Sequence, residues 1–381
     1  MIDRRSFIAS TALALFVAPH VAVARAATDR RFVFIIQRGA ADGLGIVAPV
    51  GDPAFVGLRG ALAAEAATGT RLGSMFALHP ALVETGKLFG AGEALFVHAV
   101  ASPYRDRSHF DGQNVLETGG DAAYRLKDGW MNRLLALLPR PEAKAIAVSA
   151  TVPAVLRGSR EVASYAPSAL PDASDDLLAR VSKLYEGDTQ LHGLWSQAMA
   201  TRTLTGDLSG ADGRNAAATG TLAATLLSGA AGARIASIET GGWDTHSGQK
   251  FRLQAQLRGL DAMIAALKAG LGPEWANTLV LVATEFGRTA APNGTGGTDH
   301  GTASAAMLLG GAVKGGRVLA DWPGLSAAAL HEGRDLKPTL DLDTLIASAL
   351  AEHYGLDPAR VAAALFPQGT RSQPLRGLIR T

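Results

Sequence analysis

Acidic, imidazole and hydroxyl side chains gather in five short segments of this chain. In a protein without cysteine, carboxylate oxygens and imidazole nitrogens are the groups that hold zinc and similar cations. A hydroxyl group activated by such a cation can act as a nucleophile. These residue types therefore indicate metal-dependent chemistry. The segments are RGAADG at 38–43, RSHFD at 107–111, WDTH at 243–246, TEFGR at 284–288 and TDH at 298–300.

Three of these segments supply candidate metal ligands. Asp244 and His246 form an Asp-x-His pair on a glycine-flanked loop, which offers one oxygen and one nitrogen from the same turn. Asp42 is a lone carboxylate after three small residues; it is a further candidate ligand or an ordinary turn aspartate before glycine. Asp299 and His300 are adjacent, so either both bind the metal or Asp299 orients a ligating His300.

Ser108 is the candidate nucleophile because a helix is expected to begin there. Backbone N–H groups and the helix dipole favour an anion at that position, which suits attack on a phosphoryl or sulfuryl centre. The alternative is that Ser108 and Asp111 form a helix cap. An anion site also needs polar and positive partners. The candidates for these catalytic roles are His109, Arg38, Arg107 and Arg288.

Glu285 ends a buried apolar run, where an unpaired carboxylate is costly. Either it binds the metal while Arg288 holds an anion, or Arg288 neutralises it and the pair is structural. The absence of cysteine excludes thiolate ligands and a cysteine nucleophile. The expected cofactor is therefore one or two divalent ions, namely zinc, manganese, magnesium or calcium.

Short apolar runs predict the buried strands that must position these segments. Strands are expected at 31–37, 94–100, 145–149, 234–238, 278–283 and 305–309. Helical spacing is found at 80–88, 110–117, 130–138, 253–271 and 344–352. This alternation predicts an α/β fold with a mostly parallel sheet. Ligands of such sheets bind beyond the carboxyl ends of the strands, and most of the candidate residues follow a predicted strand.

The first 26 residues have the three parts of a secretory signal. Arg4 and Arg5 precede Ser-Phe-Ile and a short apolar run, as in twin-arginine signals, and Ala24-Arg25-Ala26 is a small-x-small cleavage site. A membrane anchor is the alternative, but this run is shorter than the ~20 residues that span a bilayer. We therefore expect the twin-arginine translocase to export the domain at 27–381 to the periplasm or the exterior.

The composition is that of a globular protein, with 48% hydrophobic and 18% charged residues. A net charge of +2 gives no sign of nucleic-acid binding, and no later segment is apolar enough for a stable membrane span. The stretch at about 167–229 is rich in Ala, Leu, Ser and Gly and has no convincing strand. It predicts a helical insertion, either a lid or ordinary helices that cover the sheet.

Several motifs resemble the exported family catalogued as domain of unknown function 1501, and they occur in the same order. The resemblance runs over nearly the whole mature chain and includes LHP at 78–80 and DWPGL at 321–325. The motifs that carry it are RGAADGL at 38–44, RSHFDGQ at 107–113, GGWDTH at 241–246, EFGRT at 285–289 and GTDHG at 297–301.

That family is similar to the alkaline phosphatase and sulfatase superfamily. The resemblance implies a three-layer α/β sandwich with one or two divalent metals at the carboxyl end of its sheet. By motif position, Asp42, Asp244 and His246 match metal ligands of the superfamily. Ser108 lies roughly where the nucleophile precedes its helix.

The sequence departs from the superfamily pattern in two places. Glu285-Phe286 stands where the superfamily has Asp-His, so Asp299-His300 restores the missing imidazole or fills the last histidine position. Ala101 stands where a formylglycine sulfatase needs Cys or Ser, so that mechanism is not expected.

Two hypotheses of different class follow. The first is an exported metal-dependent hydrolase of phosphate or sulfate esters that acts on a small-molecule or polymer ester. The second is a secreted binding or assembly protein that keeps the fold and has lost the chemistry. In the second case the polar cluster is a network of paired charges, and the metal content distinguishes the two.

Overall fold

The computed structural model describes most of the chain after residue 28. The predicted twin-arginine signal at 1–26 lies outside the described residues, as does part of the predicted insertion at 167–229. The described residues are 29–65, 68–139, 144–166, 175–188, 191–193, 195–196, 199, 215–230, 232–370 and 372–380.

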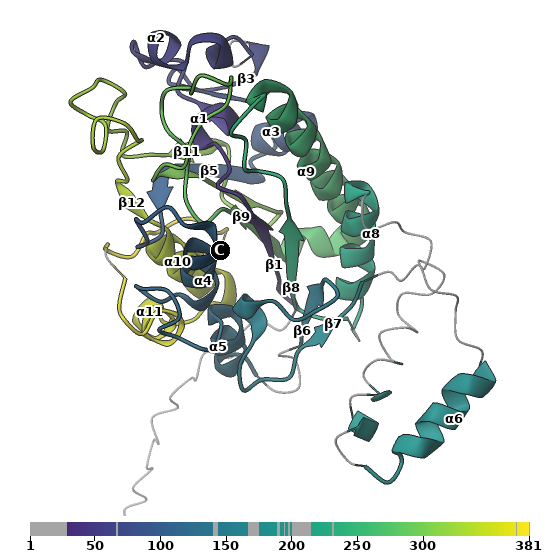
Figure 1. The fold of residues 1–381 in the computed structure, drawn as a ribbon. Coiled ribbons are helices and arrows are strands. Elements are labelled where there is room, and N and C mark those ends of the chain that lie inside the picture. Colours follow the sequence, from purple (N-terminus) through teal and green to yellow (C-terminus); the bar gives the residue numbers. More distant parts are fainter. Residues whose placement is uncertain are drawn as a thin grey trace, which may run out of the picture.

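A nine-stranded sheet forms the centre of the molecule (Figure 1). Its strand order is β11-β5-β10-β9-β1-β8-β6-β7, and β12 also pairs with β5. Only β10 runs antiparallel to its neighbours, so the sheet is mostly parallel, as predicted. The strands are β1 (Arg31–Gln37), β5 (Ala94–Ala101), β6 (Ala145–Val148), β7 (Ala163–Ser164), β8 (Ile235–Thr240), β9 (Thr278–Ala283), β10 (Ser304–Leu309), β11 (Arg317–Leu319) and β12 (Leu340–Asp341).

The apolar runs become central strands because both faces of the sheet are covered. Every residue of β1 is buried. Phe32 and Phe34 face one hydrophobic core, and Val33 and Ile35 face the other. This is the alternation that a strand with two buried faces requires.

Helices cover the two faces as separate layers, which confirms the three-layer α/β sandwich (Figure 1). On one face, α5 and α10 pack Trp130, Leu134 and Leu345 against the sheet. On the other, α9 packs Leu257 and Leu260. The first layer holds α4 (His109–Thr118), α5 (Trp130–Leu137), α10 (Leu342–Tyr354) and α11 (Pro358–Leu365). The second layer holds α3 (Val83–Gly90), α8 (Ala216–Leu227) and α9 (Gln249–Leu271).

The predicted insertion contains two described helices, α6 (Asp175–Tyr185) and α8. α8 lies along α9 and belongs to the layer that covers the sheet, whereas α6 lies apart from the sheet in Figure 1. None of the described helices is long and apolar enough to cross a membrane.

A second, three-stranded sheet follows β1 and was not predicted. Its strands are too short and too mixed in polarity to give a periodic signal. It is made of β2 (Val47–Ala48), β3 (Thr70–Leu72) and β4 (Phe76–Leu78), near α1 (Gly43–Ile46) and α2 (Phe55–Arg59). Three 3₁₀ helices complete the described elements, at Gly60–Ala63, Ala154–Leu156 and Gly272–Asn277.

Candidate metal centre

The candidate residues meet at one edge of the central sheet. β1, β5, β8 and β9 end at this edge, and the antiparallel β10 begins there. Glycines let the loops approach closely. Gly39 has a φ of 119°, and a Cβ atom there would lie 2.6 Å from the backbone nitrogen of Asp244. A Cβ at Gly297 would lie 2.2 Å from the carbonyl carbon of His246.

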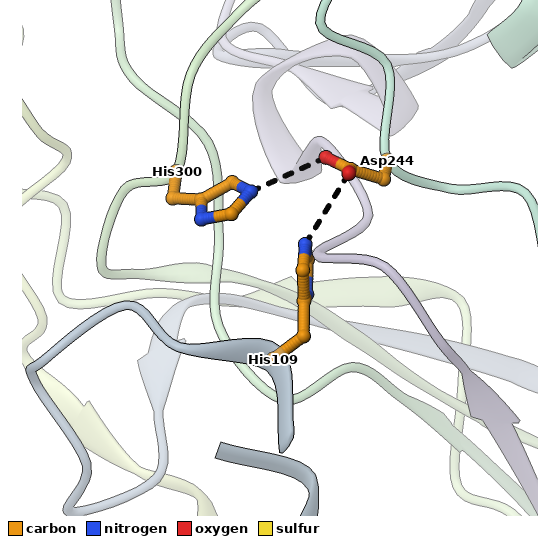
Figure 2. A group of neighbouring side chains, drawn as sticks. All are labelled: His109, Asp244 and His300. Carbon is orange, nitrogen blue, oxygen red and sulfur yellow. Dashed lines mark hydrogen bonds and ion pairs between the residues drawn. The ribbon is translucent and has the colours of Figure 1, made fainter. Parts of the chain in front are cut away.

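Three side chains point at one another at this edge, as Figure 2 shows: His109, Asp244 and His300. His109 Nε2 lies 3.4 Å from Oδ2 of Asp244. His300 Nε2 lies 3.3 Å from the other oxygen of the same carboxylate. One ligand atom from each residue lies within 4.8 Å of the other two, which is close enough for all three to bind one ion.

His246 is a fourth member of this group. Its Nε2 atom lies 3.1 Å from Oδ1 of Asp244 and 3.0 Å from Nε2 of His300. We refer to the four candidate ligands His109, Asp244, His246 and His300 as the metal centre. The sequence predicted three of them as ligands and assigned His109 to catalysis.

Each imidazole of the metal centre places its Nδ1 atom against an oxygen that accepts hydrogen bonds and has no proton to donate. The proton of the neutral ring is therefore held on Nδ1, and Nε2 keeps its lone pair. Acceptors of this kind fix the tautomer of ligating histidines in metal sites. The oxygens belong to Glu285, 2.9 Å from His109, Asp299, 3.0 Å from His246, and the backbone of Arg107, 2.8 Å from His300.

The resulting arrangement fits a divalent cation. Nε2 of His109 is buried and has no hydrogen-bond partner among the described residues. His246 and His300 turn two lone pairs toward each other at 3.0 Å, a contact without a proton to share unless one ring is charged. Imidazole nitrogens with one carboxylate oxygen are a donor set typical of zinc.

Asp244 is also bound by Arg288, whose side chain is fully buried. Nη1 of Arg288 lies 2.6 Å from Oδ1 of Asp244, and its other nitrogens donate to the hydroxyl and the carbonyl of Thr298. Burial alone would raise the pKa of Asp244, but Arg288 and then His246 outweigh it and hold the pKa below its usual value. The alternative in which Arg288 neutralises Glu285 is therefore wrong.

Glu285 is fully buried, and its carboxylate positions His109. It also accepts hydrogen bonds from the backbone N–H of Gly39 and the side chain of Gln113. Burial pushes the pKa of Glu285 up, but the hydrogen bonds led by that of His109 leave it below the usual value. The same hydrogen bond raises the pKa of His109 against the effect of burial. Burial lowers the pKa of His300.

Phe286 supports the imidazoles at the place where the resemblance led us to expect a histidine. Its ring stacks on His109, with centroids 5.1 Å apart and an interplanar angle of 21°. The His300 ring is 5.3 Å away. Phe286 therefore restricts the orientation of both rings.

Ser108 is the N-cap residue of α4 and directly precedes His109, the first helical residue. Its backbone N–H donates to the hydroxyl of Tyr104, and its carbonyl accepts from Gly112. The Ser108 side chain makes no cap hydrogen bond, so the alternative of a Ser-x-x-Asp helix cap is wrong. Capping therefore does not occupy the Ser108 hydroxyl.

Two predicted anion-binding arginines serve as supports in the structure. Arg38 donates to Gln113, which in turn contacts Glu285. Arg107 has a φ of 60°, a left-handed conformation that costs energy for a residue with a side chain. In this conformation the backbone carbonyl of Arg107 accepts a hydrogen bond from Nδ1 of His300.

The two remaining predicted ligands occupy different positions. Asp299 lies beside His246 and holds its Nδ1 proton, so it orients His246 and not the adjacent His300 that the sequence suggested. Asp42 is fully buried, and its carboxylate is bound by Arg59 and Gln249. The described contacts of Asp42 therefore connect it to α2 and α9 instead of to the metal centre.

Sequence reasoning missed the residues that connect these groups. Gln249 accepts from the hydroxyls of Thr245 and Thr298 and donates to Asp42. Asp335, which is fully buried, binds Arg107 and accepts from Thr302. An uncharged amide, three hydroxyls and one aspartate far along the chain give no local signal of such roles.

Comparisons with solved structures found likenesses of low identity. The C-terminal periplasmic domain of EcEptC from Escherichia coli matches with 10% identity and a TM-score of 0.39, over 92% of each chain. A zinc complex of the same domain matches with 8% identity and a TM-score of 0.35, over 75% of this chain and 74% of that one. The phosphonate monoester hydrolase of Agrobacterium radiobacter matches with 12% identity and a TM-score of 0.29, over 76% and 70%.

Sequence comparisons gave one family. A search of the curated proteins found no significant match. The model of the family described as protein of unknown function (DUF1501) matches residues 92–366, which is more than half of the chain and includes the whole metal centre. The chain therefore belongs to the DUF1501 family.

Proposed function

We propose that this protein is an exported metal-dependent hydrolase of phosphate or sulfate esters. The observation that supports the proposal is the convergence of three imidazole Nε2 atoms on Asp244, with every Nδ1 proton held by a separate acceptor. A cluster with a purely structural role would satisfy these nitrogens with donors. Here the lone pairs face one another.

Each residue has a distinct role in this proposal. The metal centre holds the divalent ion, which when bound supplies Lewis acidity to a substrate oxygen. The Ser108 hydroxyl displaces the alcohol of the ester, and water then releases the phosphate or sulfate and restores the hydroxyl. Glu285, Asp299 and the Arg107 carbonyl keep the imidazoles in the tautomer that binds a cation.

The first test is the metal content of the protein, purified without chelator. We expect about one divalent ion per chain, lost in Asp244→Asn and in His300→Ala. A screen of phosphate and sulfate esters on a small aryl group and on polymers follows. Ser108→Ala should abolish turnover and keep the metal, so a variant with wild-type turnover would remove Ser108 from the mechanism.

The second candidate is a secreted binding or assembly protein with the same fold. It is favoured by the carboxylate partners of Arg38, Arg107 and Arg288, which fit a network of paired charges. Such a protein would contain no metal after incubation with zinc, manganese, magnesium or calcium. Its melting temperature would also not respond to these ions.

Export is tested separately from catalysis. Replacing both Arg4 and Arg5 by lysine should leave the full-length precursor inside the cell, because the twin-arginine translocase recognises the arginine pair. Fractionation of cells that express the two forms gives the answer. Export of the double variant at the wild-type level would exclude this route.

A further inference from the structure

The arginines that border the metal centre are already neutralised by carboxylates. Arg38 lies 2.8 Å from Glu117 and 2.7 Å from Glu239. Burial alone would lower the pKa of Arg38, but these two carboxylates raise it above the usual value. Two hydrogen bonds link Arg38 to Glu285 through the side chain of Gln113.

The same pairing occurs on the other side of the centre. Arg107, whose carbonyl binds His300, lies 2.8 Å from the fully buried Asp335 and 2.6 Å from Glu332. Arg334 donates to the carbonyl of His300 and lies 2.9 Å from Asp335.

Within the metal centre itself, Arg288 is bound to Asp244 at 2.6 Å. Four bordering arginines thus face five carboxylates in the described part of the chain. The five are Glu117, Glu239, Glu332, Asp335 and Asp244. Their sum is one negative charge, and none of these arginines has its charge free for a ligand.

This balance bears on which ester fits the site. A phosphate monoester carries ~2 negative charges above pH 7, whereas a sulfate ester or a phosphate diester carries one. A dianionic group needs cationic partners beyond a single metal ion, or it is repelled by the surrounding carboxylates. We propose, on the basis of the proposed function, that the substrate is a tetrahedral ester with a single negative charge.

The test compares two ligands that differ by one charge. Phenylphosphonate is a dianion at pH 8 and its methyl ester is a monoanion of nearly the same shape. Titration calorimetry with the zinc-loaded protein measures both dissociation constants without turnover. We expect the methyl ester to bind at least ~3-fold more tightly.

Tighter binding of phenylphosphonate would overturn this inference and leave the proposed function intact. Failure of both ligands to bind the zinc-loaded protein would overturn both this inference and the proposed function. Turnover rates give the same comparison. An aryl sulfate and a bis-aryl phosphate are the monoanionic substrates, and an aryl phosphate is the dianionic one.

A variant of Glu239 tests whether the paired arginines cause this charge preference. Glu239 is partly exposed, and Glu239→Gln keeps its shape while it removes one of the two carboxylates on Arg38. The preference for the monoanion should fall by ~3- to 10-fold. Asp121→Asn, at an exposed pair with Arg125, is the matched control and should keep the wild-type ratio. An unchanged ratio in Glu239→Gln would show that the paired arginines do not set the charge preference.

Discussion

Replacing Glu285 by glutamine tests whether this buried carboxylate positions a ligating histidine or binds the metal itself. One carboxylate oxygen accepts from Gly39 at 2.8 Å, His109 at 2.9 Å and Gln113 at 3.1 Å. The glutamine carbonyl oxygen can accept the same three hydrogen bonds, which become weaker because the acceptor is no longer charged. The substitution therefore changes charge while it keeps shape and contacts.

The contact of the second carboxylate oxygen of Glu285 can also be replaced in the glutamine variant. This oxygen lies 2.9 Å from the hydroxyl of Thr284, which is 2.7 Å from the carbonyl of Gln37. In Glu285→Gln the new amide donates to that hydroxyl, and the hydroxyl proton goes to Gln37. No buried group loses its partner, so we expect the melting temperature to stay close to that of the wild type.

The expected loss of zinc affinity is that of an outer-shell carboxylate. Removing the charge lowers the basicity of His109, and such changes cost ~10- to 100-fold in metal affinity, or about 1.4 to 2.7 kcal/mol. Competition with a fluorescent chelator at fixed pH measures the dissociation constant. Glu93→Gln is the matched control, because Glu93 precedes β5 at the opposite edge of the sheet and pairs with Lys268.

Two results would contradict this reasoning. A dissociation constant equal to that of Glu93→Gln would mean that Glu285 has no influence on the metal. A loss far greater than ~100-fold would instead identify Glu285 as a ligand, as the sequence predicted.

Three further changes probe the support of the site and the fold. Gly39→Ala should weaken metal binding and cost ~1–3 kcal/mol in urea unfolding, because the new Cβ meets the loop after β8; Gly57→Ala, with open space around it, should do neither. Arg59→Met should cost ~3–5 kcal/mol in the same assay, because it leaves Asp42 buried and unpaired; full recovery by added metal would contradict this. The buried His353 has its pKa lowered to about 3, so below pH 6.5 the unfolded chain binds a proton that the folded chain does not. Stability should therefore fall by ~1.4 kcal/mol per pH unit from this group, and His353→Gln, compared in chelator between pH 6.5 and 5, should lack that slope.

The central strands were predictable because burial on both faces leaves a continuous apolar run. β1 and β9 begin and end at the predicted residues. The direction of β10 was not predictable, because an apolar run such as 304–309 reads the same in either direction. The edge strands β11 and β12 are short and partly exposed, so they have no such run.

The sequence predicted which residues gather at the site better than it predicted what each residue does there. Histidines beside acidic residues at strand ends were the signal that identified His109, His246 and His300. Which acid faces the imidazole Nε2 atoms and which holds an Nδ1 proton depends on side-chain direction. Asp244 points at the imidazole Nε2 atoms and Glu285 at an Nδ1 atom, a distinction that spacing in the sequence does not encode.

The carboxylate partners of the arginines were also not predictable from the sequence. Arg38, Arg107 and Arg288 were predicted to hold an anion because they lie beside the motifs. Each is paired with at least one carboxylate that is distant in sequence, such as Glu239, 201 residues from Arg38, and Asp335, 228 residues from Arg107. An arginine that fixes a loop must itself be fixed, and the carboxylate that fixes it also cancels its charge. In this fold an arginine can therefore either hold the groups that position the imidazoles or attract a second anionic charge. The geometry indicates that these arginines hold the positioning groups.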